Sequence, residues 1–276
     1  MQSLSVICDL GAVVLLVMAA ARGAKGHALH AIVPYLASGL ACATLAAILA
    51  AQPSFGNLLL VVLALGVGST LGGVAAIGVS LARIPLVLTG FLVLYGLVAL
   101  LLSFAATDAA GLVGHVRGGP GDLERKGAAM IAAIAGSLVL GGGGVLFLQR
   151  LRPVPQPSRS PARPRRALLG FAAAGAVMAV VFLAADALTA FWISSAAAVL
   201  TGAALVWPLG EHARWPLSVL LTALCGFATA AVGFALANLL LIIAGGLVGA
   251  SMVAVFSGLC REAGSRPFRL LFGKRS

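Results

Sequence analysis

Nine long apolar segments constrain the fold of this chain more than any other feature. The hydrocarbon core of a bilayer is about 30 Å thick, so an α-helix needs about 20 apolar residues to cross it. Only 9% of the 276 residues are charged, against about 25% in a soluble domain. The sequence therefore predicts an all-α, polytopic membrane helix bundle of about nine transmembrane helices. The expected spans are Leu4–Ala21, Leu29–Ala50, Asn57–Leu81, Pro85–Ala106, Ala128–Leu148, Ala167–Ala185, Ala190–Leu209, Pro216–Leu236 and Leu239–Leu259.

The basic residues fall on one side of the membrane if the chain crosses it nine times. Fifteen of the 18 Lys and Arg residues then lie on one side and three on the other. Because positive residues accumulate in cytoplasmic loops, we expect an outside amino terminus and a cytoplasmic carboxyl terminus. The charge of +11 is concentrated beside apolar segments, so lipid rather than nucleic acid is the expected partner.

The segment 149–166 separates two groups of spans. It is rich in proline, which cannot continue a helix, and in arginine, whose charges repel, so we expect an extended cytoplasmic linker. The chain is then one transmembrane domain over 1–276. Its parts are spans 1–5 at 4–148, the linker at 149–166, spans 6–9 at 167–259 and a basic cytoplasmic tail at 260–276.

The centres of the expected spans hold no ionisable side chain apart from thiols and Tyr95. Charged groups inside a bilayer are costly and usually mark a proton or ion path. A self-contained ion pump is therefore not indicated. The four cysteines are widely spaced and form no Cys-x-x-Cys pair, so neither a disulfide framework nor a metal site is predicted.

Glycine pairs spaced by one helical turn predict close helix contacts. Membrane helices associate through small residues that let their backbones approach each other. Gly68 and Gly72 share one face of the third span, and Gly245 and Gly249 share one face of the ninth. We interpret both pairs as helix-packing positions.

Two of the spans begin with the same pattern, in which a proline is followed by a glycine and then, eight residues later, by a phenylalanine. The two sets are Pro85, Gly96 and Phe104, and Pro216, Gly226 and Phe234. The proline can start a helix at the membrane surface. The glycine permits close approach of another backbone at mid-membrane.

The carboxyl-terminal part of the chain resembles a known family. The run at 226–251, GFATAAVGFALANLLLIIAGGLVGAS, is similar to the last two membrane helices of the beta subunit of proton-translocating NAD(P) transhydrogenase. The similarity is weaker but collinear over the rest of the chain. It implies nine spans, an outside amino terminus, a cytoplasmic carboxyl terminus and the same paired proline-to-glycine helices.

The chain departs from this family where the family moves protons. The resemblance implies a histidine four residues before the glycine of the first paired helix, and an asparagine at the same place in the second. These positions hold Leu92 and Thr222 here. Leucine cannot bind a proton, so the titrating site of the family is absent. The acidic residue expected after Asn238 is replaced by Leu239, and the NADP-binding domain that normally follows is expected on another chain.

The resemblance implies a membrane-embedded, proton-channel-like component of an NAD(P) transhydrogenase. Such a component couples proton translocation to hydride transfer between NADH and NADP on separate nucleotide-binding subunits. The chain itself is expected to bind no cofactor and to be non-catalytic alone, with NAD and NADP held by its partners. The implied partners are the transhydrogenase alpha subunit, an NADP-binding domain and a second copy in a homodimer, in a bacterial inner (plasma) membrane.

Two other functions remain open at this stage. The chain could be a divergent, non-pumping scaffold on the same fold, which the absence of ionisable groups from the helix centres favours. It could also be a permease for a neutral solute, which needs no charge inside the membrane.

The residues expected at a proton path or helix interface follow from the same comparison: Thr222, Asn238, Gly245, Gly249, Ser251, Gly226 and Gly96. Asn238 is expected at the turn between the last two spans, and the glycines at helix contacts. Ser251 and Thr222 could order water. Each residue also has a purely structural interpretation, as a loop cap, a packing glycine, or a hydroxyl bonded to its own helix backbone.

Overall fold

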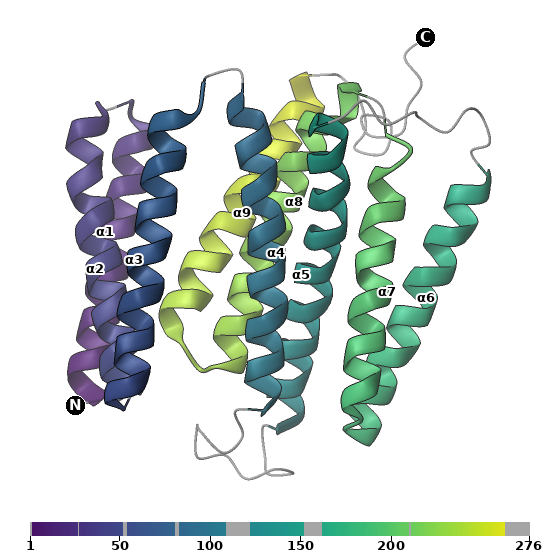
Figure 1. The fold of residues 1–276 in the computed structure, drawn as a ribbon, viewed down its shortest axis with the longest axis horizontal. Helices are drawn as coiled ribbons and strands as arrows, with labels where there is room; N and C mark the ends of the chain where they lie inside the picture. The colour runs from purple at the N-terminus through teal and green to yellow at the C-terminus, as the bar shows by residue number, and fades with distance from the viewer. Residues whose placement is uncertain are drawn as a thin grey trace. The chain divides into compact units, whose positions relative to one another are not determined.

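The computed structural model describes residues 2–26, 28–51, 54–80, 83–108, 122–151, 162–209 and 211–262. Within these ranges the chain forms nine helices and no strand, and every helix is long and apolar enough to cross a membrane (Figure 1). The predicted all-helical membrane fold is therefore confirmed. The helices are α1 (Gln2–Ala24), α2 (Leu29–Ala51), α3 (Phe55–Gly78), α4 (Ile84–Asp108), α5 (Asp122–Leu151), α6 (Ala162–Ala185), α7 (Leu188–Val206), α8 (Glu211–Ala235) and α9 (Leu239–Glu262).

The chain divides into two compact units, residues 1–84 and 85–276. In the first unit α1 and α2 pack against each other. The Ser5 hydroxyl donates a hydrogen bond to the Ala46 carbonyl at 3.3 Å. At the other end of the pair, the Arg22 guanidinium lies 4.1 Å from the centre of the Tyr35 ring, a cation–π contact.

Helix α3 presents its glycines to open space. No residue of its apolar stretch Phe55–Val74 is buried, and a Cβ added at Gly68 or Gly72 would meet no atom within 4 Å. Within the described residues of the first unit, the helix packing predicted for this pair is therefore not formed.

In the second unit α5 is the central helix. It packs against α7 and α8, while α6 with α7 and α8 with α9 form adjacent pairs. Of the most apolar window of α5, 61% is buried, against 11% in α6. Over residues 168–185, the side chains of α6 that remain exposed are apolar, as expected for a surface in contact with lipid.

Glycines set the closest approaches between these helices. Gly141 of α5 lies against α7, where an added Cβ would stand 2.0 Å from the Val199 carbonyl oxygen. On the α7 side of the same contact, a Cβ added at Gly202 would stand 2.3 Å from the Leu138 carbonyl oxygen. Because backbones touch at these points, any side chain larger than hydrogen would force the helices apart.

The turn from α8 to α9 is closed by backbone hydrogen bonds. Asn238 N donates to Gly233 O at 2.8 Å and Ala237 N donates to Phe234 O at 3.2 Å, the paired bonds of a Schellman motif. Ala237 has φ 52°, a conformation that usually selects glycine. The Asn238 side-chain oxygen then accepts from Leu241 N at 3.1 Å, which caps the first turn of α9.

Helix α5 begins six residues before its predicted start at Ala128, because its charged first turn is neutralised by other elements. The Lys126 ammonium bridges the Asp122 carboxylate at 2.9 Å and the Asp186 carboxylate, at the α6–α7 turn, at 2.8 Å. The Arg125 guanidinium contacts Asp122 at 2.7 Å and donates to the Ala106 carbonyl of α4 at 3.2 Å. These ion pairs allow four charged groups to remain at one end of the bundle.

The segment predicted as a linker is shorter than expected at both ends. Helix α5 continues to Leu151 and α6 already begins at Ala162. The rest of the predicted linker, at 152–161, and the tail from 263 lie outside the described residues.

Candidate functional site

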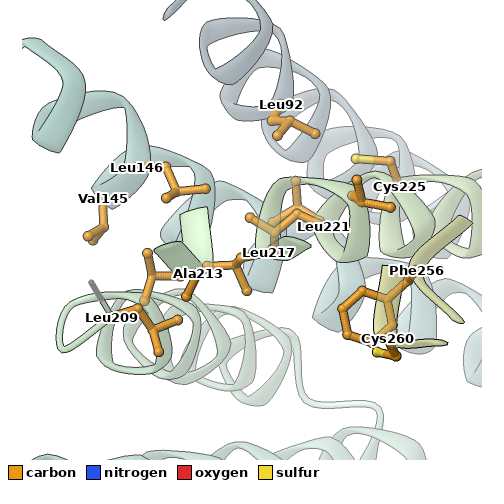
Figure 2. Packing of buried hydrophobic residues seen from close by; sticks show 13 residues of the cluster. Leu92, Val145, Leu146, Leu209, Ala213, Leu217, Leu221, Cys225, Phe256 and Cys260 are labelled. Carbon is orange, nitrogen blue, oxygen red and sulfur yellow. The ribbon is translucent and has the colours of Figure 1, made fainter. Parts of the chain in front are cut away.

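Leu92 lies in a packed apolar cluster. It is on α4, only 9% of its surface is exposed, and its neighbours come from α5, α7, α8 and α9. The buried members are Leu92, Val139, Val145, Leu146, Val206, Leu209, Ala213, Leu217, Val219, Leu221, Cys225, Phe256 and Cys260. Figure 2 shows Leu92 facing Leu221 and Cys225 of α8, with no charged group among the labelled side chains. The position at which the family resemblance implies a histidine is therefore part of the hydrophobic core.

Thr222 is half-buried on α8, where the resemblance implies an asparagine. Its hydroxyl donates to the Ser218 carbonyl of the same helix at 2.8 Å. This bond uses the only proton of the hydroxyl, although the oxygen can still accept one. The arrangement agrees with the structural interpretation of this residue.

The predicted glycines of α8 and α9 are brought together. A Cβ added at Gly226 would stand 2.3 Å from Gly249 N and 2.8 Å from Gly245 O. A Cβ added at Gly245 would stand 2.4 Å from Ala230 N. The two backbones are thus in direct contact over more than one turn, and a Cβ added at Gly249 would stand 2.9 Å from the Phe227 ring.

Gly96 of α4 also lies at a close backbone contact, in this case with α5. A Cβ added there would stand 2.6 Å from Leu140 N and 2.7 Å from Gly136 O of α5. The two glycines of the repeated pattern therefore fix two separate contacts, α4 with α5 and α8 with α9. One turn further along α4, Ala99 meets Ala135 of α5 and Ala228 of α8 in a buried cluster of small side chains.

Asn238 and Ser251 are not part of this contact. Asn238 caps α9 at the α8–α9 turn, which is the position predicted for it. Ser251 is exposed, and its hydroxyl donates to the Val248 carbonyl of its own helix at 3.0 Å. Leu239, where the resemblance implies an acidic residue, begins α9 and is 53% exposed.

A hydrogen bond between Tyr95 of α4 and Thr229 of α8 was missed by the sequence analysis. The two hydroxyl oxygens are in direct contact. The Thr229 hydroxyl also lies 2.9 Å from the Cys225 carbonyl oxygen, to which it donates, so Tyr95 acts as donor to Thr229. Nothing in the spacing of the two residues indicates the pair, because they are 134 positions apart.

Two buried serine hydroxyls have no partner, and they too escaped the sequence analysis as a pair. Ser137 of α5 and Ser195 of α7 are 0% and 2% exposed, and neither oxygen makes a hydrogen bond. Ser137 lies one turn before Gly141, and Ser195 one turn before Val199, at the α5–α7 contact. The adjacent Ser194 is satisfied, since it donates to the Gly175 carbonyl of α6 at 2.9 Å.

The chemistry available inside the second unit is therefore hydroxyl chemistry. Among the described residues there is no group of three or more His, Cys, Asp or Glu side chains that could hold a metal ion. The ion pairs of Asp122, Arg125, Lys126 and Asp186 lie at the end of α5. Between them and the far end, the described helices carry serine, threonine and tyrosine hydroxyls and the buried thiols of Cys225 and Cys260. The hydroxyls can relay a hydrogen bond but do not titrate near neutral pH.

The sequence model of the family described as NAD(P) transhydrogenase beta subunit matches residues 6–274. No curated protein matches the chain significantly. The family match extends over all nine described helices and thus over both compact units.

Proposed function

Because the chain belongs to the NAD(P) transhydrogenase beta subunit family, we propose that it couples proton translocation to hydride transfer between NADH and NADP. The chain is a multi-pass membrane protein with the composition of a transhydrogenase membrane component. Hydride transfer takes place on separate nucleotide-binding subunits, which hold NAD and NADP. The family match over residues 6–274 is the observation that carries this proposal.

The packing of α4, α5, α8 and α9 supports a mechanical role for the bundle. Glycine contacts join α8 to α9 and α4 to α5 without intervening side chains. The Tyr95–Thr229 hydrogen bond links the first pair to the second. A change imposed on one pair by a bound subunit is thereby passed to the other, because closely packed elements move together rather than deform.

The charge distribution supports the proposed orientation. We place the amino terminus outside and the carboxyl terminus in the cytoplasm of a bacterial inner membrane, since 15 of the 18 basic residues then face the cytoplasm. The alpha subunit and an NADP-binding domain approach from that side. A homodimer is the assembly we expect.

Reconstitution tests the coupling. The chain is placed in proteoliposomes with the alpha subunit and an NADP-binding domain of the same family. Reduction of an NADP analogue by NADH is followed by absorbance while a pH-sensitive dye reports acidification of the vesicle interior. Coupling predicts acidification during the reaction and a faster reaction when an ionophore collapses the proton gradient. The control is the same vesicle without the chain, which must show neither effect.

One observation favours a second function, a scaffold that does not move protons. Leu92 is buried in an apolar cluster, so hydrocarbon fills the position at which the family resemblance implies a titrating group. This function predicts that the chain still assembles with the nucleotide-binding subunits. It also predicts hydride transfer at one rate with and without the ionophore, and no acidification.

A further inference from the structure

The central helix α5 contains four consecutive glycines, Gly141–Gly144, and it stays helical through all of them. Successive residues of a helix point about 100° apart, so these glycines face different neighbours. Apart from proline, glycine is the poorest helix former, because its backbone can adopt many other conformations. The run is therefore the intrinsically weakest part of α5, unless packing against other helices requires glycine at each position.

At the first two positions of the run, packing leaves little room for a side chain. A Cβ added at Gly141 would stand 2.0 Å from the Val199 carbonyl oxygen of α7. A Cβ added at Gly142 would stand 3.1 Å from a methyl group of Val206 and 3.3 Å from one of Leu221, which is closer than most real Cβ contacts. The contacts of α5 with α7 and α8 therefore account for these two glycines.

Packing does not account for the last two positions. A Cβ added at Gly143 would stand 3.4 Å from the Leu92 Cβ of α4, an ordinary van der Waals distance. A Cβ added at Gly144 would meet no described atom of the second unit within 4 Å. Alanine fits at both positions and would make a more stable helix. What distinguishes glycine here is thus the freedom of its backbone.

The glycine run separates two parts of α5 that are anchored to different elements. Before it, the Lys126 ammonium contacts the Asp186 carboxylate at the α6–α7 turn, at 2.8 Å. After it, Leu146 is fully buried in the cluster that α5 forms with the α7–α8 connection and α8 (Figure 2). The Gln149 amide nitrogen lies 3.5 Å from the Trp207 carbonyl oxygen, at the end of α7. A bend at the run would therefore move the last two turns of α5 together with the start of α8.

We propose that α5 has a hinge at Gly143 and Gly144, about which residues 145–151 move with the start of α8 against the rest of the second unit. Hinges are short segments that absorb changes of φ and ψ, and glycine absorbs them with the least strain. Leu92 packs directly on Gly143, so the bend changes the packing of the apolar cluster to which Leu92 belongs. The hinge is a property of the chain alone, and only its use in coupling rests on the proposed function.

Hydrogen–deuterium exchange of the purified full-length chain in mild detergent tests the hinge. Protection factors of the amides of residues 144–148 are compared between wild type and G144A. Local opening at the hinge predicts that G144A raises these protection factors about fivefold, because alanine disfavours the opened backbone. The matched control G127A adds a methyl group to the same helix, at another glycine with no described neighbour within 4 Å. It leaves the amides of 144–148 unchanged.

A double variant and a measurement of stability keep this outcome decisive. G143A/G144A must raise the same protection factors further than G144A, and both variants must unfold at a higher concentration of sodium dodecyl sulfate than wild type. Equal effects of G144A and G127A over the whole chain overturn the hinge, since exchange would then require unfolding of the entire bundle. So do unchanged protection factors at 144–148 in a G144A protein that is more stable than wild type.

Turnover in proteoliposomes with the partner subunits tests whether the bend is used. G144A is expected to reduce the NADP analogue about fivefold more slowly than wild type, since the bent state is populated about fivefold less. G127A keeps the wild-type rate. An unchanged rate in G144A with raised protection factors shows a hinge that the reaction does not use, and it overturns the link to coupling. If wild type itself shows neither reduction nor acidification, the proposed function fails, whereas the exchange experiment still decides the hinge.

Discussion

Replacing Gly226 by alanine tests whether the stability of the α8–α9 contact depends on direct approach of the two backbones at this position. The new Cβ would stand 2.3 Å from Gly249 N, whereas ordinary contact begins at 3.4 Å, so α8 and α9 must move apart by about 1 Å. Overpacking of this kind costs about 1–3 kcal/mol. Alanine returns up to about 1 kcal/mol through its higher helix propensity. We therefore expect G226A to lose about 1–2 kcal/mol of unfolding free energy.

Two glycines of the facing helix α9 give matched control variants. A Cβ at Gly246 meets no atom within 4 Å, so G246A is expected to be neutral or more stable by up to about 1 kcal/mol. A Cβ at Gly249 meets the Phe227 ring at 2.9 Å. Because a ring can rotate away and a backbone cannot, G249A should fall between the other two variants.

The assay is reversible unfolding of the purified chain in mild detergent by added sodium dodecyl sulfate, followed by far-ultraviolet circular dichroism and tryptophan fluorescence. From the most to the least stable, the predicted order is G246A, G249A and G226A. If G226A is as stable as G246A, the α8–α9 contact does not exclude a methyl group, and the reasoning from backbone approach fails.

Four other substitutions test three separate features by the same unfolding assay. A237G should raise the unfolding free energy by about 0.5–1 kcal/mol, because glycine adopts the left-handed φ of 52° without strain; a loss of stability would contradict the turn geometry. S194A should lower it by about 0.6 kcal/mol, since the bond to the Gly175 carbonyl is lost, whereas S195A should raise it by about 1 kcal/mol by removing a buried hydroxyl without a partner. A loss of stability in S195A would mean that the Ser195 hydroxyl has a hydrogen-bond partner, such as a bound water. L92H should lower the unfolding free energy by about 1–3 kcal/mol, because it buries a polar ring in an apolar cluster. It should not produce proton flux in proteoliposomes, since Thr222 uses its hydroxyl proton on the Ser218 carbonyl. Acidification with this single change would refute that view.

The positions of the membrane spans could be predicted because the information is local. A run of about 20 apolar residues excludes charged groups wherever it lies in the chain, and the bilayer requires every backbone group in it to be bonded within a helix. The start of α5 is the exception. Its charged turn joins the helix because Lys126 meets Asp186, which is 60 residues away in sequence and close only in the folded chain.

The glycine motifs show where such local information ends. Gly68 with Gly72 and Gly245 with Gly249 have the same spacing. Among the described residues of its own compact unit, however, only the second pair meets another backbone. The motif indicates that the backbone of another helix can approach closely. Which helix approaches, and whether any does, depends on how the other helices pack.

The sequence by itself determined an all-helical membrane protein, its family, the capping position of Asn238 and the absence of a titrating side chain at Leu92, because each is a property of residue type and neighbouring residues. The tertiary structure decided that Leu92 closes an apolar cluster and that Tyr95 bonds Thr229. These pairings join helices that are far apart in the chain. Their energy depends on distance and burial, which a one-dimensional pattern does not contain.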